Sequence, residues 1–140
     1  MNSIVRAAAF AALGVAAVLA SGCATTSTKQ AQAVEDRAVK RWDLLIAGKA
    51  DEAYELLTEG YRSTHPKDVY VAAKTHTAIT WKAAKFSDKQ CESEEVCTVR
   101  ILLTYSLTMH AGMPKPVEAS TYESEKWIKS GGQWFHLPRE

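Results

Sequence analysis

The cysteines are the residues whose type and spacing could most directly carry chemistry. The 140-residue chain has three, and two of them, Cys91 and Cys97, stand six positions apart in the segment CESEEVC. Such a pair could be a redox couple, part of a metal site or a disulfide across a turn. The segment alone leaves these alternatives open. The choice depends on the compartment, because disulfides persist mainly in oxidising environments.

The N-terminal segment indicates export. Arg6 is the only charge before an apolar run of 14 residues, 7–20, and no acidic residue precedes Glu35. A positive start, a short apolar stretch and small residues after it are typical of a secretory signal peptide. A spanning helix needs about 20 apolar residues, so an uncleaved transmembrane helix is the weaker interpretation.

The apolar run ends in LASGC, 19–23, which resembles the lipobox of bacterial lipoproteins. That pattern prefers a larger aliphatic residue three places before the cysteine; here Ala20 holds this place and Leu19 precedes it. An ordinary secreted protein cut nearby is the alternative. The resemblance implies a signal peptide at 1–22 and a lipidated Cys23 that attaches the chain to a membrane. Ala24, rather than Asp, after the cysteine implies the outer membrane, with the domain facing the periplasm.

The remainder divides into a tether and one domain. Residues 23–33 are small and polar, and residues 34–140 form a single domain long enough to bury a sizeable core. Without Arg6 the chain carries 16 basic and 16 acidic residues. This balance gives no support for nucleic-acid binding or for a second, electrostatic membrane contact.

Export changes the interpretation of the cysteine pair. If Cys23 is lipidated, Cys91 and Cys97 are an even pair in an oxidising compartment, and they flank the turn between two expected strands. A redox motif is more often C-x-x-C at a helix start, and structural zinc needs further ligands nearby. We therefore predict a disulfide that bridges the hairpin, with the glutamates at its solvated tip.

Other reactive residue types do not form a motif. The four histidines lack the spacing of a metal site, and no phosphate-binding loop or nucleophile elbow is present; they are His65, His76, His110 and His136. No cofactor or metal is indicated.

The periodicity of apolar residues predicts helices first and strands afterwards. Helices are expected at 33–49, 51–63 and 64–74, with Gly48 ending the first, Gly60 ending the second and Thr64 capping the third. Strands are expected at 77–86, 97–110, 117–129 and 133–138. A two-residue turn in SGGQ would pair Ile128 with Phe135 and Trp127 with His136. This order predicts an α+β fold with the helices on one face of an antiparallel sheet.

The strand at 97–110 shows the clearest alternation. One face carries Val99, Ile101, Leu103, Tyr105, Leu107 and Met109. The other carries Thr98, Arg100, Thr104, Ser106, Thr108 and His110, with Leu102 as its apolar exception. The first set is expected to face the core and the second solvent.

The segments RWDLLIAGKADEAYELLTEGYRS and SEKWIKSGGQWFH, together with this long strand, resemble the nuclear transport factor 2-like, or cystatin-like, superfamily over about 34–137. The resemblance implies N-terminal helices packed on a strongly bent antiparallel sheet that forms a cone with a pocket. Members include isomerases, dehydratases, hydrolases and non-enzymatic binding modules, so the fold does not fix the function.

The residues favour a non-catalytic binding or scaffolding role. Enzymes such as the ketosteroid isomerases that the chain resembles use carboxylates and a tyrosine inside the cone, whereas the inward face of the best strand has no carboxylate. Candidate pocket residues are Trp42, Tyr54, Tyr61 and Tyr105. Candidate residues for a homodimer or an envelope partner on the outer sheet face are Arg100, Leu102, Thr104 and Ser106.

The alternative is a small-molecule-binding protein, or an isomerase- or hydrolase-like enzyme, that uses the cone pocket. A cavity with a buried carboxylate beside a tyrosine would favour this alternative. A filled apolar cone would favour the binding module.

Overall fold

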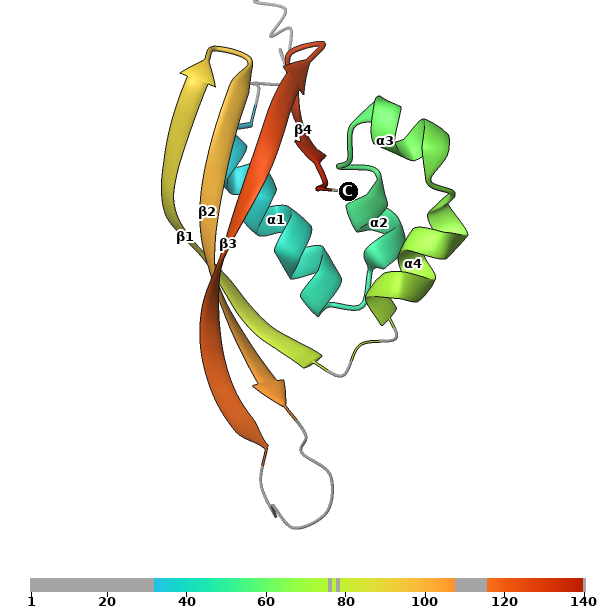
Figure 1. The fold of residues 1–140 in the computed structure, drawn as a ribbon, viewed down its shortest axis with the longest axis vertical. Helices are drawn as coiled ribbons and strands as arrows, with labels where there is room; N and C mark the ends of the chain where they lie inside the picture. Colours follow the sequence, from blue (N-terminus) through green and yellow to red (C-terminus); the bar gives the residue numbers. More distant parts are fainter. Residues whose placement is uncertain (1–31, 76, 78, 108–115, 140) are drawn as a thin grey trace, which may run out of the picture.

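The computed structural model describes residues 32–75, 77, 79–107 and 116–139, which form four helices and one four-stranded antiparallel sheet (Figure 1). The helices are α1 (Val34–Ile46), α2 (Ala50–Tyr54), α3 (Glu59–Thr64) and α4 (Lys67–Thr75). The strands are β1 (Ile79–Ser93), β2 (Val96–Leu107), β3 (Val117–Ser130) and β4 (Gln133–Leu137), in that spatial order. The predicted α+β class is confirmed. No helix in these described ranges is long and apolar enough to cross a membrane.

Several expectations lie outside the described residues. They are the signal peptide 1–22, Cys23 with most of its tether, and the side chains of His76, Thr108, Met109 and His110.

The first helix is confirmed, and the second prediction is wrong in form. Residues 51–63 do not make one helix, because the chain breaks between α2 and α3 and Gly60 lies inside α3. The backbone N–H of Thr58 donates to the carbonyl of His136 at 2.9 Å, and the N–H of His136 donates to the carbonyl of Leu56 at 2.8 Å. These bonds to β4 use backbone groups that a continuous helix would need for itself.

The third helix is present but begins later than expected. Thr64 is the last residue of α3 and does not cap α4. The Pro66 carbonyl instead accepts the N–H of Tyr70 at 3.1 Å, so the proline stands immediately before the helix. Pro is tolerated at a helix start because its missing N–H would be unpaired there.

The C-terminal hairpin matches its prediction closely. Ser130 pairs with Gln133, and both glycines between them have positive φ angles, 55° and 76°. The register places Ile128 opposite Phe135 and Trp127 opposite His136. Paired glycines suit such a turn because they adopt positive φ without strain.

The alternation of β2 holds over most of its length. Val99, Ile101 and Leu103 are buried as expected. Ser106 corrects the prediction, because it is only 7% exposed rather than part of the open face. Lys82 is an extra residue of β1 between the pairs Trp81–Tyr105 and Ala83–Thr104. Such a bulge increases the local twist, and Ser106 lies just beyond it.

Two clusters make up the core. In the larger one, Val34, Ala38 and Trp42 of α1 pack on apolar side chains of the sheet, which include Val99, Ile101, Leu103, Trp127 and Trp134. Figure 1 shows α1 lying along the sheet, with α2, α3 and α4 beyond it. The smaller cluster joins Tyr54, Leu57 and Tyr70 from that helical layer. Burying each large apolar side chain contributes about 1.5–3 kcal/mol.

Candidate functional site

A buried ion pair connects the first helix to the sheet. Arg41 of α1 and Glu125 of β3 are 4% and 2% exposed, and Arg41 Nη2 donates to Glu125 Oε1. Two indoles complete the shell of the carboxylate: Trp42 Nε1 donates to Oε1 at 2.8 Å, and Trp127 Nε1 donates to Oε2 at 3.2 Å. Glu125 is therefore the centre of a polar network within an otherwise apolar core.

The network explains how two charges are tolerated at this depth. Removing an ion from water costs several kcal/mol, which a partner charge and further hydrogen bonds must offset. Glu125 receives three donors, one of them charged. Its carboxylate thus fixes the position of Arg41 on the inner side of α1.

A pocket of about 290 Å³ opens onto this pair. Its apolar walls are Trp42, Trp81, Leu103, Leu137 and Pro138. Its charged lining is Arg41, Lys74, Glu123, Glu125, Lys126 and Arg139, and His136 also contributes. The cavity is therefore lined by residues from α1, α4, each of the four strands and the C-terminal segment.

Three buried polar atoms at or beside the pocket have no hydrogen-bond partner among the residues that the structure describes. They are Arg41 Nε, His136 Nδ1 and the Tyr70 hydroxyl. Buried polar groups are nearly always paired, because an unpaired one costs about 1–3 kcal/mol. Arg41 and His136 line the cavity directly. Buried polar atoms without partners at a cavity wall are available to form hydrogen bonds to a polar ligand.

The local electrostatics are positive. Burial lowers the pKa of His136 to about 2, and the charges of Arg41, Lys74 and Arg139 act in the same direction, so this imidazole is neutral. Burial also lowers the pKa of Lys74, and Arg41 lowers it further. Much of the Lys74 residue is exposed, yet its ammonium lies 5.6 Å from the centroid of the Tyr70 ring and lines the pocket.

The predicted pocket residues fall into two groups. Trp42 lies 5.1 Å from the Trp81 ring, and Trp81 lies 5.6 Å from Tyr105, so these three rings form an edge-to-face series beside the pocket. Tyr54 and Tyr61 belong to the smaller core cluster instead. The Tyr54 hydroxyl donates to the carbonyl of His65 at 2.6 Å. The structure therefore does not gather the four predicted aromatic residues around one cavity.

The charged members of the site were not predicted from the sequence. Glu125 stands two residues before Trp127, and residues two apart on a strand share a face, so the predicted pairing of Trp127 with His136 could have placed Glu125 inside. Arg41 follows Ala38 by three positions and lies on the same helical face. Arginine beside an apolar stripe usually extends to solvent, so its burial had no clear signal in the sequence.

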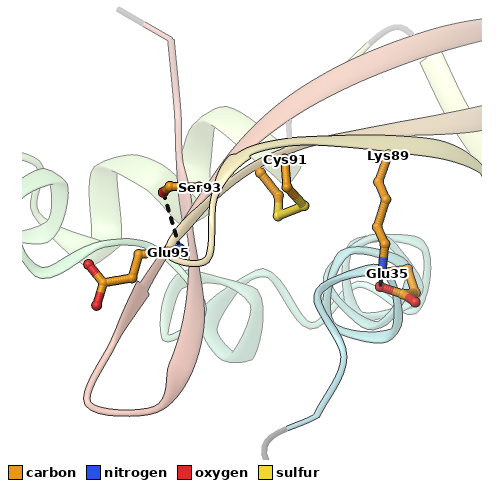
Figure 2. Close-up of a disulfide and its surroundings, with 6 residues drawn as sticks. Glu35, Lys89, Cys91, Ser93 and Glu95 are labelled. Carbon is orange, nitrogen blue, oxygen red and sulfur yellow. Dashed lines mark hydrogen bonds and ion pairs between the residues drawn. A yellow bond between two sulfur atoms is a disulfide. The ribbon is translucent and has the colours of Figure 1, made fainter.

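The predicted disulfide is confirmed. Cys91 and Cys97 are direct partners in the β1–β2 hairpin, their Cα atoms are 3.9 Å apart, and their sulfurs are bonded. Figure 2 shows the bridge between the two strands, with Glu95 N–H donating to Ser93 Oγ in the turn at 3.2 Å. The same view shows Lys89 paired with Glu35 of α1 at 2.6 Å, which joins the hairpin to the helix. The glutamates of the tip are exposed, as expected.

The outer sheet face carries one exposed aromatic residue beside Leu102. Tyr122 is 57% exposed and is the direct cross-strand partner of Leu102, which is half-buried. The Arg100 guanidinium lies 5.1 Å from the Tyr122 ring centroid, and Thr104 Oγ1 is 3.2 Å from Ser120 Oγ. Arg100, Leu102 and Thr104 thus share the outer face, whereas Ser106 does not.

Comparisons with known proteins bear on the fold alone. No protein-family model matches the chain, and no curated protein sequence matches it. The solution structure of a SEC-C motif containing protein from Rhodopseudomonas palustris is similar with a TM-score of 0.57 and 19% identity, covering 76% of this chain and 77% of that one. The crystal structure of a protein described as a candidate ketosteroid isomerase from Shewanella frigidimarina aligns with a TM-score of 0.44 and 13% identity, covering 72% of this chain and 87% of that one. The chain therefore shares its fold with the Rhodopseudomonas protein.

Proposed function

We propose that the chain is a membrane-anchored envelope lipoprotein whose domain binds a small molecule without catalysing a reaction. The observation that carries the binding role is the pocket at the Arg41–Glu125 pair, where buried nitrogens of Arg41 and His136 have no hydrogen-bond partner among the described residues. Ligand sites combine apolar walls with convergent polar groups, and this cavity has both, with more polar than apolar residues in its lining. Glu125 places a buried carboxylate at this cavity, although no tyrosine of the described residues lines it.

The arrangement of Glu125 supports binding over catalysis. A general base needs a carboxylate with a free lone pair aimed at the substrate and a pKa suited to proton transfer. Glu125 instead accepts from Arg41, Trp42 and Trp127. Glu123, the other carboxylate of the lining, is exposed to solvent and lies 3.7 Å from Arg139. In this proposal both carboxylates position cations.

The anchor and the compartment rest on the sequence. LASGC supports cleavage before Cys23, acylation of that cysteine, and a location at the outer membrane facing the periplasm. Several acyl chains would hold the protein firmly, because each buried methylene contributes about 0.8 kcal/mol. Within the same proposal, the domain is a nuclear transport factor 2-like cone, and α1 packed on the sheet supports that description.

Metabolic labelling with an acyl probe tests the anchor. The wild-type protein should carry the label and Cys23→Ala should not. Label that persists in Cys23→Ala would rule out lipidation at this site.

Tryptophan indole signals test the binding role. Trp42 and Trp81 line the pocket, whereas Trp134 lies in the same core but not in the lining, so its indole N–H is an internal control. A library of charged and neutral fragments should contain members that shift the Trp42 and Trp81 signals in the full chain held in detergent. If no fragment moves these two signals selectively, the pocket is not a binding site.

A second candidate function is association through the outer sheet face. Leu102 beside the exposed Tyr122 supports a contact with a second copy or another envelope protein. Sedimentation of the full chain in density-matched detergent, compared with the double variant Leu102→Lys, Thr104→Lys, tests the homodimer. The wild type should sediment as a dimer and the variant as a monomer; a monomeric wild type would exclude this version.

A further inference from the structure

The charges around the pocket do not cancel. Arg41 is paired with Glu125, Arg139 lies 3.7 Å from Glu123, and Lys126 lies 3.3 Å from Glu92 outside the pocket. Lys74 also lines the pocket but has no ion-pair partner among the described residues. One positive charge of the lining is therefore left without a counter-charge.

The unpaired polar atoms also favour a ligand that accepts hydrogen bonds. Only 4% of the Arg41 surface is exposed, and its Nε lacks an acceptor among the described residues. Nε cannot lose its proton, since arginine stays charged in proteins. His136 Nδ1 is equally unpartnered, and in one neutral tautomer it donates as well. Lys74 adds an ammonium with three donors. The cavity therefore offers donors and one excess positive charge, and it calls for an acceptor group with one negative charge.

The walls and the volume restrict the rest of the ligand. About 290 Å³ is at the small end for a ligand site. The rings of Trp42 and Trp81 meet edge to face at 5.1 Å and form an aromatic part of the lining. Inorganic anions would leave this wall uncovered, whereas a flat or short apolar body would cover it.

We propose that the ligand is a small organic monocarboxylate, with its carboxylate between Arg41 and Lys74 and its apolar body against Trp42 and Trp81. The inference rests on the proposed function, because it specifies the ligand class of the same pocket. Glu125 is a positioning residue here, because its carboxylate accepts from Arg41 and holds that guanidinium in the pocket wall. Burial is the main cause of the lowered pKa of Lys74, with Arg41 acting in the same direction, and a bound carboxylate should raise that pKa again.

A matched pair of probes tests the charge requirement. Phenylacetate and phenylacetamide have nearly the same shape, but only the first is charged. Both are titrated into the isotope-labelled full chain in detergent, and binding is followed by the Trp42 and Trp81 indole signals and by the Lys74 side-chain resonances. Phenylacetate should bind at least about tenfold more tightly than the amide, because charge-assisted hydrogen bonds are roughly twice as strong as neutral ones.

Two lysine variants locate the effect. Lys74→Gln should abolish most of the preference for phenylacetate. Lys40→Gln is the matched control, since Lys40 is also an exposed helical lysine but does not line the pocket, and it should keep the preference. A rise in the pKa of Lys74 on adding phenylacetate is the second readout, and a contribution of Lys74 to folding alone would not produce it.

The outcomes separate this inference from the binding role. Equal affinity for the amide, a preference retained in Lys74→Gln, or inorganic phosphate that displaces phenylacetate at equal concentration would overturn the monocarboxylate. Fragments that bind but are all neutral would also overturn it and leave the binding role intact. If no fragment shifts the Trp42 and Trp81 signals, both proposals fall.

Discussion

At the scale of single residues, the Arg41–Glu125 pair is the feature on which the core and the pocket both depend. The two side chains lie inside an apolar cluster built by α1 and the sheet. Their net contribution to stability is small when both are present, because desolvation offsets most of the attraction. Removing one partner would leave the other charge buried and unpaired, which destabilises the fold strongly. Loss of either side chain would therefore both destabilise the core and change the wall of the pocket.

We expect Glu125→Gln to lower the free energy of unfolding by about 3–5 kcal/mol, since Arg41 would remain buried without its counter-charge. Urea denaturation followed by tryptophan fluorescence measures this. Glu118→Gln, at an exposed site of the same strand, is the control and should change stability by less than about 0.5 kcal/mol. A double variant, Arg41→Met with Glu125→Leu, should recover most of the loss. A loss below about 1 kcal/mol in Glu125→Gln would show that the pair is not buried as described.

His136 gives a pH dependence whose direction follows from its pKa. The pKa falls from the ordinary 6.5 to about 2 on folding, first through burial and then through the charges of Arg41, Lys74 and Arg139 that face it. The neutral form is the folded form, so the unfolded chain takes up the extra proton. Stability from this residue is complete above pH 6.5 and declines as the pH falls towards 2, by about 1.4 kcal/mol per unit.

Denaturation at pH 7, 6 and 5 measures this slope. His136→Gln keeps the backbone bonds to Leu56 and Thr58 and should flatten the curve between pH 6.5 and 5. An unchanged slope in His136→Gln would show that another group causes the dependence. The carboxylates whose pKa is lowered by ion pairs, such as Glu35 beside Lys89, titrate further down and do not account for this window.

At this scale the sequence predicted some contacts and not others. The pairing of Trp127 with His136 followed from the glycine turn, because a two-residue turn fixes the register of both strands. The burial of Arg41 could not be predicted in the same way, because it depends on a partner 84 residues away. Charged residues are assigned to the surface by default, and only the packed structure shows which one has a partner inside.

At the scale of elements, the contacts between segments decided where the helices end. The apolar pattern of 51–63 suits one helix, yet the carbonyl of Leu56 and the N–H of Thr58 bond to His136. Propensity is a weak preference that tertiary bonds override. The strand at 97–110 was easier to predict, because alternation over ten or more residues has no competing interpretation. The strand expected at 77–86 instead continues to Ser93 as β1, and its bulge at Lys82 left no mark in the pattern.

The Cys91–Cys97 bridge should contribute about 2–2.5 kcal/mol, the loop-entropy estimate for so short a ring. Replacing both residues by alanine should lower the free energy of unfolding by this amount, measured in urea. The wild type reduced before denaturation should lose a similar amount, which separates loss of the bridge from loss of the buried Cys97 sulfur. Free thiols in the purified, unreduced protein, counted under denaturant, would contradict the bridge itself.

At the scale of the whole molecule, the proposed periplasmic location and the stability of the fold are linked through the Cys91–Cys97 disulfide. A disulfide forms and persists in the periplasm and is rare in the cytoplasm, where thiols are kept reduced. The α+β architecture was predictable because helices precede strands in the chain. The compartment was predicted from the N-terminal residues. The geometry of the hairpin disulfide does not depend on those residues, and its presence is consistent with an oxidising compartment.

This link gives a prediction about export. The full chain, made with its own residues 1–22, should reach the envelope and contain an oxidised Cys91–Cys97 pair. A version lacking residues 2–22 should stay in the cytoplasm with both thiols free, and it should be less stable by the same 2–2.5 kcal/mol or so. Oxidation of that purified version should restore the lost stability, because the cysteines already face each other in the hairpin register. If the purified version lacking residues 2–22 can be oxidised but the version that retains 1–22 has two free thiols, export is contradicted, since the strands would then have folded in a reducing compartment.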